Sequence, residues 1–480
     1  MDIDVPENER PLVAMAGASG FVGTHLRTAL AKHFSFRALT RSPNVIGRAR
    51  THGHTEWTHC DLYSLPQLTE ALKGCRIGIY LVHSMAPSSR LVQANFADTD
   101  ILLADNFARA AEAAGVEHII YLGGLMPKAG EQVSPHLASR EEVERVLRSR
   151  SVPVTVLRAG LIFGPGGSSF SMLINLVGRL PLMILPAWTE STTHSIDIQD
   201  VCRAFEMVLL EEDLHGQTYD IAGHNAMTYR ELILTTAKLT GNPVRSISVP
   251  VNCFSLSQRW VSWFGGVPCE LVGPLLESLK HDLTAKKNPI LDRLSDGAVT
   301  FEESLQRSVD EAGKPKPNPR SAFRQVDVQH IRKASLVRSV QRMSLPGGVD
   351  AQEMATEYGE WLTRVFRGFI RVTRNEEGVL RFCVFKDNWV LLELTPTPFS
   401  ANHPIRCAFY ITGGILARDV SPKGRFEFRI FPSIGISVAS IHGFAPRLPW
   451  LIYANTQARA HLWVMQAFGR HLSSLGPKRQ

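Results

Sequence analysis

The stretch LVAMAGASGFVG, residues 12–23, decides the fold of this chain. Its first half is a short apolar run typical of a buried parallel strand, and three glycines follow where a helix is expected to begin. Glycine permits a tight turn, a close approach of the backbone to a phosphate, and close packing of a helix on a strand. Amides at the helix N-terminus would then face a pyrophosphate. The stretch predicts a dinucleotide site, rather than an empty structural turn, formed by Gly17, Ala18, Ser19, Gly20, Phe21, Val22 and Gly23.

Short apolar runs alternate with helical stretches over the first 160 residues. The opening run is followed by SFRALT (35–40), RIGIYLV (76–82), EHIIYLG (117–123) and VPVTVLR (152–158). Helical stretches are expected between them, notably at 91–115 and 136–150. This alternation is typical of βαβ units around a buried parallel sheet. The predicted fold class is therefore α/β, with a Rossmann-type doubly wound parallel sheet.

The pattern changes after residue 312. The segment GKPKPNPR (313–320) has three prolines and three basic residues in eight positions, which is typical of a semi-rigid linker. Beyond it, a helix at 350–366, five strand-like runs and a final helix at 450–473 predict an α+β domain, whose element order is similar to helix-grip folds. We expect four parts: an NAD(P)-binding domain at 1–160, a substrate-binding region at 161–312, a linker at 313–324 and an α+β domain at 325–480.

The composition excludes several classes of protein. The chain has 480 residues, of which 44% are hydrophobic, 20% charged and 8% aromatic, values that argue against collagen, coiled coil and wholesale disorder. The first residues, MDIDVPENER, are unlike a secretory signal, and no apolar run reaches the length of a membrane span, so we expect a cytoplasmic protein. Seven scattered cysteines without a C-x-x-C pair predict neither a disulfide framework nor a metal site.

The net charge of +7 is unevenly distributed along the chain. Residues 331–480 carry 20 Lys and Arg against 10 Asp and Glu, whereas the other residues carry 32 against 35. A basic C-terminal part is compatible with an apolar or anionic ligand, or with peripheral contact to a membrane. The alternative is that these basic residues only form a solvent-exposed face without a ligand. No nucleic-acid partner is expected.

The end of the second strand bears on the cofactor. An NAD-binding Rossmann domain usually carries an acid there to hold the ribose 2′-hydroxyl, but the sequence has no acid from 37 to 50. Arg41 offers a planar guanidinium that matches a 2′-phosphate, which favours NADP as the cofactor over NAD. The alternative interpretation is that Arg41 is only an exposed arginine in a loop. Asp61 and Leu62, after the third strand, are expected beside the adenine. His83, after the fourth strand, is expected beside the nicotinamide.

With these features in hand, the chain resembles the short-chain dehydrogenase/reductase superfamily, most of all its extended and atypical members. The resemblance covers about residues 11–310 and continues through YLGG (121–124), LRAGLIFGPG (157–166) and HSIDIQDV (194–201). These segments are similar to those of a bacterial subgroup of NAD(P)-binding, epimerase-like proteins with an appended C-terminal domain. The resemblance implies an oxidoreductase acting on a small or hydrophobic carbonyl or alcohol.

The sequence departs from the family at the expected catalytic positions. Typical members carry a serine at the end of the fifth strand and a Tyr-x-x-x-Lys pair on the next helix. Here the strand ends in Gly123 and Gly124, and His136 and Arg140 stand where the resemblance implies the tyrosine and the lysine. Their i, i+4 spacing keeps both on one helix face. The candidate catalytic residues are therefore His136 and Arg140, together with Asn106, which matches an asparagine position of the family. Alternatively, His136 and Arg140 are only a surface pair, and Asn106 is only an amide that faces a helix.

Two functions of different classes follow from these observations. The first is an NADP(H)-dependent oxidoreductase with altered catalytic positions. The second is a non-catalytic dinucleotide-binding sensor or scaffold, as in the NmrA-like regulators that the superfamily includes, whose C-terminal domain binds an apolar ligand or a partner. The missing serine and tyrosine favour the sensor, whereas the retained helix spacing and the long 161–312 region favour the enzyme.

Overall fold

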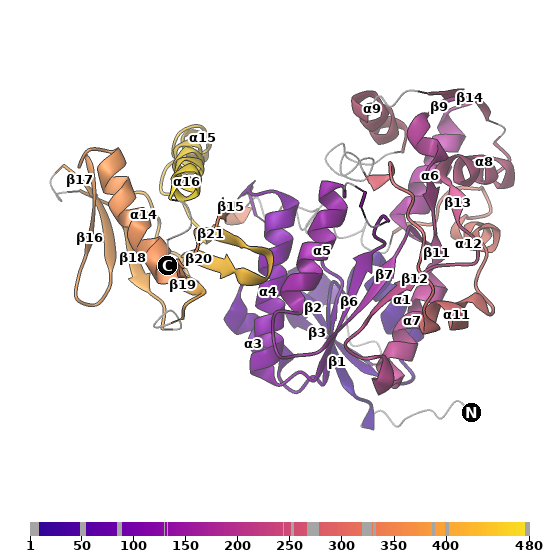
Figure 1. Ribbon diagram of the computed structural model, residues 1–480, viewed down its shortest axis with the longest axis horizontal. Helices are drawn as coiled ribbons and strands as arrows, with labels where there is room; N and C mark the ends of the chain where they lie inside the picture. The colour runs from indigo at the N-terminus through magenta and orange to yellow at the C-terminus, as the bar shows by residue number, and fades with distance from the viewer. Residues whose placement is uncertain are drawn as a thin grey trace. The chain divides into compact units, whose positions relative to one another are not determined.

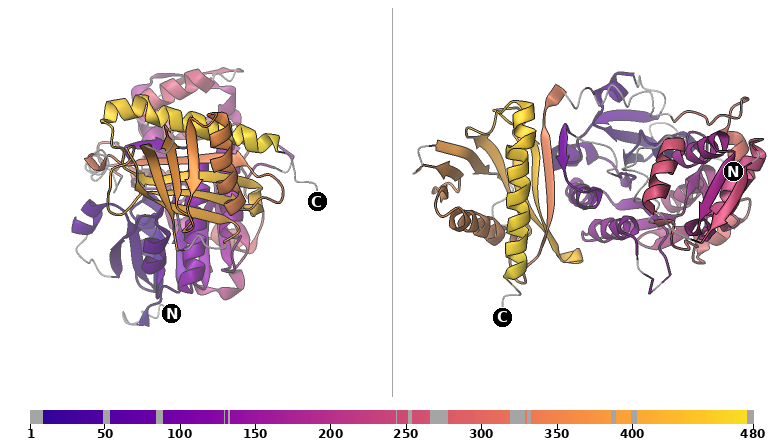
Figure 2. Two further views of the ribbon diagram at one scale, coloured as in Figure 1. Left: turned by 90° about the vertical axis from the view of Figure 1, so that its left-hand side faces the viewer. Right: turned by 90° about the horizontal axis from the view of Figure 1, so that it is seen from above.

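The computed structural model describes residues 9–48, 54–83, 89–128, 130–131, 133–242, 244–250, 254–265, 278–318, 329, 333–385, 389–398 and 403–475. The chain forms two compact units (Figures 1 and 2). The first comprises residues 1–83 and 103–325, and the second comprises residues 84–102 and 326–480. Among the residues described, no helix is both long and apolar enough to cross a membrane.

A parallel sheet forms the centre of the first unit. Within the described ranges its seven strands lie in the order β12 (Thr218–Ile221), β7 (Val154–Ala159), β6 (His118–Gly124), β4 (Ile77–Tyr80), β1 (Leu12–Ala16), β2 (Ser35–Thr40) and β3 (Thr55–His59). Each neighbouring pair is parallel. The strand order reverses between β1 and β4, and at such a switch point α/β proteins bind ligands beyond the carboxyl ends of the strands. The predicted Rossmann-type sheet is confirmed.

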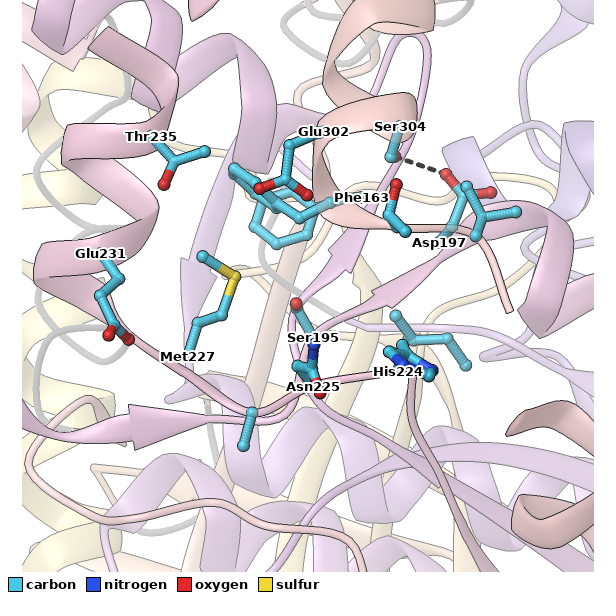
Figure 3. Close-up of a pocket in the computed structure, with 16 residues that line it drawn as sticks. Phe163, Ser195, Asp197, His224, Asn225, Met227, Glu231, Thr235, Glu302 and Ser304 are labelled. Carbon is cyan, nitrogen blue, oxygen red and sulfur yellow. Dashed lines mark hydrogen bonds between the residues drawn. The ribbon is translucent and has the colours of Figure 1, made fainter. Parts of the chain in front are cut away.

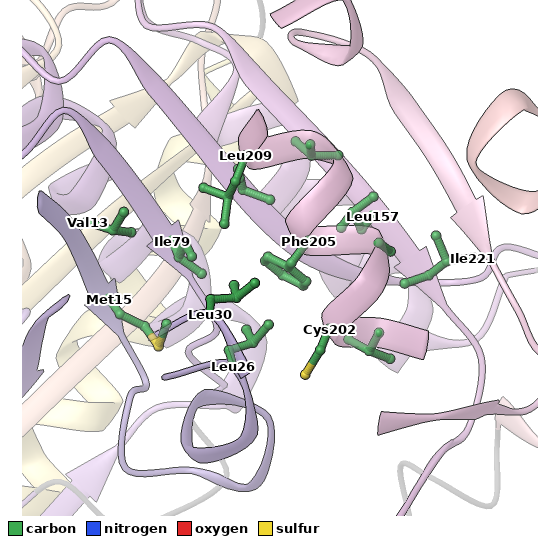
Figure 4. Packing of buried hydrophobic residues seen from close by; sticks show 14 of the residues in the cluster. Val13, Met15, Leu26, Leu30, Ile79, Leu157, Cys202, Phe205, Leu209 and Ile221 are labelled. Atoms are coloured by element: carbon green, nitrogen blue, oxygen red, sulfur yellow. The ribbon is translucent and has the colours of Figure 1, made fainter. Parts of the chain in front are cut away.

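Helices cover both faces of this sheet. One face carries α3 (Leu65–Leu72), α4 (Phe96–Ala114) and α5 (Pro135–Leu147), and the other carries α1 (Phe21–Ala29) and α7 (Ile198–Leu210) (Figure 1). The short α2 (Pro43–Arg48) follows β2. Leu26 of α1 and Phe205 of α7 are fully buried against strand residues such as Met15 and Ile79 (Figure 4). Because each fully buried large apolar side chain contributes roughly 1.5–3 kcal/mol, this layer stabilises the carboxyl edge on which the site is built.

The remaining part of the first unit forms a smaller layer after β7. Its core is aromatic, with Phe163, Phe170, Trp188 and Tyr229 buried together. Its elements are β8 (Ile162–Phe163), α6 (Ser168–Arg179), β9 (Leu182–Pro186), β10 (Thr192–Thr193), β11 (Ile196–Asp197), β13 (Met227–Thr228), α8 (Tyr229–Leu239), β14 (Arg245–Val249), α9 (Phe254–Gly265), α11 (Pro289–Ser295) and α12 (Phe301–Ser308).

The second unit is built on a mostly antiparallel sheet. In the part of the chain that the structure describes, its eight strands lie in the order β16 (Ile370–Arg374), β17 (Leu380–Val384), β18 (Trp389–Pro396), β19 (Arg406–Gly413), β20 (Arg425–Phe431), β21 (Ile436–Phe444), β15 (Val337–Ser344) and β5 (Leu91–Gln93). Only the β15–β5 pair among these is parallel. The predicted α+β character is confirmed.

Two helices pack on one face of this second sheet, α14 (Ala351–Val365) and α16 (Gln457–Ser474) (Figures 1 and 2). Tyr358 of α14 and Phe468 of α16 meet at 5.0 Å between ring centroids, so aromatic side chains fill the core. The final helix predicted at 450–473 is in fact two, because Thr456 (φ −120°, ψ −82°) is not helical and separates α15 (Trp450–Asn455) from α16. A helix-grip arrangement is not shown.

Residues 91–93 depart from the sequence expectation. The stretch 91–115 predicts a helix of the first domain, but α4 begins only at Phe96 and residues 84–102 belong to the second unit. Leu91 pairs with Val337 of β15, and Gln93 accepts a hydrogen bond from Gln341 Nε2 at 2.5 Å. The physical reason is that β15 has a second edge whose backbone groups need partners, and β5 supplies them.

Candidate functional site

The glycine loop is packed closely at Gly17 and Gly23. Gly17 has φ +89°, and a Cβ there would lie 3.0 Å from the Cβ and the carbonyl oxygen of Leu81. A Cβ on Gly23 would lie 2.7 Å from the Gly17 oxygen and the Ala18 Cα. The Gly20 amide donates to the Gly17 carbonyl at 2.9 Å and begins α1 without a side-chain cap. This close packing, before a helix N-terminus that has no side-chain cap, fits a dinucleotide pyrophosphate.

Arg27 contacts the glycine loop, and the sequence analysis did not predict this contact. Its Nε donates to the Ala18 carbonyl at 3.2 Å, and its guanidinium lies 4.8 Å from the centroid of the Trp57 ring. Burial lowers the pKa of Arg27 from its ordinary value. The available signal was the i, i+4 spacing from Gly23, which places Arg27 one turn further along α1.

Arg41 directly follows Thr40, the last residue of β2, and is partly buried. It therefore lies at the same carboxyl edge of the sheet as the glycine loop after β1, as predicted for a residue that faces the adenosine ribose. Asp61 follows β3 at the same edge, and its Oδ1 accepts a hydrogen bond from the Tyr63 amide at 3.3 Å. These positions are compatible with the predicted cofactor contacts, which stay a proposal.

Asn106 has a clear contact in the structure. It is 1% exposed, and its Nδ2 donates to the Leu62 carbonyl at 2.9 Å. The side chain thus holds the loop that follows β3, where the sequence predicts the adenine. This contact favours a positioning role for Asn106 over the predicted catalytic one.

The structure brings His83 and His136 together. His83 lies three residues beyond the end of β4, and His136 is in the first turn of α5. Their ring centroids are 5.3 Å apart, with 47° between the ring planes. The start of α5 is well defined, because Ser134 accepts a hydrogen bond from the Leu137 amide at 3.3 Å and Pro135 occupies the first turn. The sequence assigned these histidines to separate roles, but they form one pair.

The position of the family serine lies against the same helix. A Cβ on Gly124, at the end of β6, would lie 3.6 Å from Leu137 Cδ2 and 3.9 Å from Arg140 Cγ, which are ordinary contact distances. Tyr121 donates a hydrogen bond to the Arg140 carbonyl at 3.4 Å and connects β6 to α5. Gly124 therefore lies against α5 beside Arg140, and the catalytic roles predicted for His136 and Arg140 stay a prediction.

A cavity of about 460 Å³ lies in the smaller layer of the first unit (Figure 3). Its lining comes from four separate segments and includes Phe163, Ser195, Asn225, Met227, Glu231 and Glu302. The segments at 163 and at 223–235 follow the carboxyl ends of β7 and β12, where ligands of α/β proteins bind. The volume is in the range of small-molecule sites. The lining includes none of the residues predicted from the sequence.

Asp197 lines this cavity, and a second buried aspartate, Asp200, lies one turn further along α7. Asp197 caps α7 and accepts a hydrogen bond from Ser304 at 2.5 Å (Figure 3). Arg307 lies 2.8 Å from the same carboxylate. Asp200 accepts from the Val299 amide at 2.9 Å, and burial raises its pKa. These contacts tie residues 299–307 to α7 and give this part of the cavity lining a defined position.

Comparisons with known proteins identify the family to which most of the first unit is related. Residues 9–263, just over half of the chain, match the NmrA-like family. The auxiliary protein GraX of Staphylococcus aureus is 25% identical over 115 residues, which are 24% of this chain and 37% of GraX. The ceramide reductase of Caulobacter vibrioides is 26% identical over 303 residues, 59% of this chain and 89% of that protein. The Citrobacter triphenylmethane reductase complexed with NADP(H) is 21% identical, with a TM-score of 0.49 over 62% of this chain and 100% of that one.

The match begins before the glycine loop and extends through α8 to α9, so it includes the loop, both histidines and Arg140. The chain belongs to the NmrA-like family of atypical short-chain dehydrogenases/reductases, with an NAD(P)-binding Rossmann domain over residues 9–263 and an additional region beyond it.

Proposed function

We propose that the protein is an NADP(H)-preferring reductase of a hydrophobic carbonyl compound, with His136 as the proton donor. The observation that carries the proposal is the His83–His136 pair, 5.3 Å apart, at the carboxyl edge of the sheet. This edge also holds the glycine loop, since Gly17 packs against Leu81, two residues before His83. A cofactor held by the loop would therefore extend toward the two histidines.

The chain's own residues supply the proton and the positioning. Bound NADPH would supply a hydride to the carbonyl carbon of the substrate. His136 would then donate a proton to the carbonyl oxygen, because imidazole can hold and release a proton near neutral pH. Arg140, one turn further along α5, would hold a ribose hydroxyl or phosphate oxygen, the place that the resemblance implies for the lysine. His83 would contact the imidazole of His136 and limit its orientation.

The cofactor preference rests on Arg41. It follows β2 where NAD-binding domains carry an acid, and a guanidinium there pairs with the 2′-phosphate that distinguishes NADP from NAD. The proposed preference for NADP therefore depends on a single residue, Arg41, at the carboxyl edge of the sheet.

The substrate class rests on two observations. The cavity of about 460 Å³ has apolar walls from Phe163 and Met227 beside carboxylate and amide groups, which suits an amphipathic carbonyl compound. In addition, the relative from Caulobacter, which this chain matches over 89% of its length, is named a ceramide reductase. We therefore propose a long-chain carbonyl substrate ahead of a small polar one.

The test is NADPH oxidation with a carbonyl panel that runs from quinones and short aldehydes to long-chain keto-lipids. For an active substrate, His136→Ala should lower turnover by about 10²-fold with little change in NADPH affinity, the scale expected for a general acid. Arg140→Ala should weaken NADPH binding instead. The control is His33→Ala, outside the pair. Full turnover in His136→Ala would remove it from the mechanism.

The second candidate is a dinucleotide sensor without turnover. It is supported by Gly124, which places no hydroxyl at the serine position although an added Cβ would make only ordinary contacts there. The two functions differ in one measurement: a sensor binds NADPH and oxidises it with no member of the panel. In that case Gly124→Ser should also leave the protein inactive.

A further inference from the structure

One surface of the second unit exposes three large aromatic side chains in contact. Phe369 is 57% exposed, Phe385 is 60% exposed and Trp389 is 57% exposed. The rings of Phe369 and Phe385 lie 5.4 Å apart edge to face, and those of Phe385 and Trp389 lie 6.3 Å apart. Contiguous exposed apolar groups of this kind mark interaction sites. We call these three residues the aromatic patch.

The sheet geometry places the aromatic patch at one end of an edge hairpin. Ile370 pairs with Val384, and Val384 pairs with Trp389, so the start of β16, the end of β17 and the start of β18 lie together. Ile370 packs on the core of the unit, and the alternation of a strand turns Phe369 away from it. Phe385 has φ +53°, a conformation that is uncommon for a bulky residue and that occurs at functional sites.

A further aromatic contact involves the residue three positions before Phe369. Phe366 lies directly before the aromatic patch, and the Phe369 amide donates to its carbonyl at 2.8 Å. The Phe366 ring contacts Trp463 of α16 edge to face at 6.2 Å, and Trp463 is 51% exposed. Another exposed aromatic side chain, on α16, thus contacts the segment that leads into the patch.

Arginines accompany these aromatic residues. The segment RVFRGFIRVTR (364–374) has four arginines and no acid, and all four arginines are exposed. Glu357 forms an ion pair with Arg364, which lies five residues before Phe369. The next acids, Glu376 and Glu377, lie in the turn between β16 and β17, at the opposite end of the hairpin from the patch. The sequence between Phe385 and Trp389 adds one lysine and one aspartate and so no net charge. The net positive charge in the sequence around Phe369 comes from the exposed Arg367 and Arg371.

We propose that the aromatic patch, with Arg367 and Arg371, docks on the surface of an anionic lipid bilayer. Aromatic rings favour the boundary between head groups and acyl chains, and arginines beside them pair with lipid phosphates. A second copy of the chain fits this surface less well, because a two-fold contact would bring the arginines of both copies together. The proposal does not rest on the proposed enzymatic function.

The experiment is co-sedimentation of the full-length protein with vesicles of phosphatidylcholine alone or with 30% phosphatidylglycerol, over a salt series. Binding should require the anionic lipid and should weaken as salt rises. Trp389→Ala should reduce binding about tenfold, by the loss of most of one large apolar side chain from the interface. Arg371→Glu should reduce it at least about fivefold, by the loss of one cation near the surface.

Matched controls come from the first unit. Trp263, which is 81% exposed on α9, and Arg245, which is exposed on β14, lie outside the patch. Trp263→Ala and Arg245→Glu should bind vesicles like the wild type, and all four variants should share the wild-type unfolding midpoint. Equal losses in patch and control variants would overturn the proposal, as would binding to neutral vesicles alone or no binding at all. A wild-type dimer that Trp389→Ala dissociates, without vesicle binding, would show instead that the patch is a self-association surface.

Discussion

Replacing Gly23 by alanine should disrupt both the glycine loop and the cofactor site. The added Cβ would lie 2.7 Å from the Gly17 oxygen and the Ala18 Cα and 2.9 Å from the Ala18 carbonyl carbon. Carbon atoms in contact are ordinarily about 3.5–4.0 Å apart, so the overlap is close to 1 Å and involves only backbone atoms. Because backbone cannot rotate away as a side chain can, α1 must move outward from β1. Such overpacking costs about 1–3 kcal/mol.

That cost should appear in two measurements. If the displaced helix recovers its position only when the cofactor binds, the Kd for NADPH should rise about 5- to 150-fold. If α1 shifts in the free protein as well, the urea midpoint of the first unit should fall. The control is Gly47→Ala in α2, where a Cβ would meet nothing within 4 Å and helix propensity predicts no loss of stability. Gly23→Ala with wild-type affinity and wild-type stability would refute the close-packing argument.

Three further predictions address other parts of the chain. Arg41→Ala should reduce the preference for NADPH over NADH by roughly 10- to 150-fold, the value of a charge-assisted contact of about 1.5–3 kcal/mol; titration of both cofactors checks this, and an unchanged preference would exclude Arg41. Burial lowers the pKa of His118 to about 3, so the unfolded chain binds the extra proton below pH 6.5 and stability should fall as the pH drops from 7 to 5. His118→Gln should show a smaller fall in its urea midpoint over that range, whereas an identical fall would mean that His118 does not contribute. A fragment of residues 326–480 lacks β5 and exposes the second edge of β15, so its unfolding midpoint should lie below that of the same unit in the full chain; equal midpoints would show that residues 84–102 are dispensable.

Local signals in the sequence were sufficient for the fold class and the cofactor loop. The apolar runs at 12–17, 35–40, 76–82, 117–123 and 152–158 each overlap a strand of the parallel sheet. They could be recognised because a strand buried on both faces needs a continuous apolar run, whatever lies around it. The glycine spacing was equally informative, since the lack of space at Gly23 follows from a local strand–turn–helix geometry.

Contacts between distant segments could not be recognised in this way. Residues 91–93 have no periodicity that distinguishes a short strand from a helix start, and only pairing with β15, more than 240 residues later, makes them β5. The cavity lined by residues near 163, 195, 225 and 302 likewise depends on how four segments pack.

The sequence by itself determined that a dinucleotide loop opens a parallel βαβ domain, and that His136 and Arg140 stand where tyrosine and lysine are usual. The tertiary structure decided which residues face each other there. His83 and His136 are 53 positions apart in the chain, and they meet because β4 and β6 pair in parallel and direct the segments that follow them to the same sheet edge. Strand pairing and helix packing set such distances through the register of the whole sheet, and no local stretch of sequence contains that register.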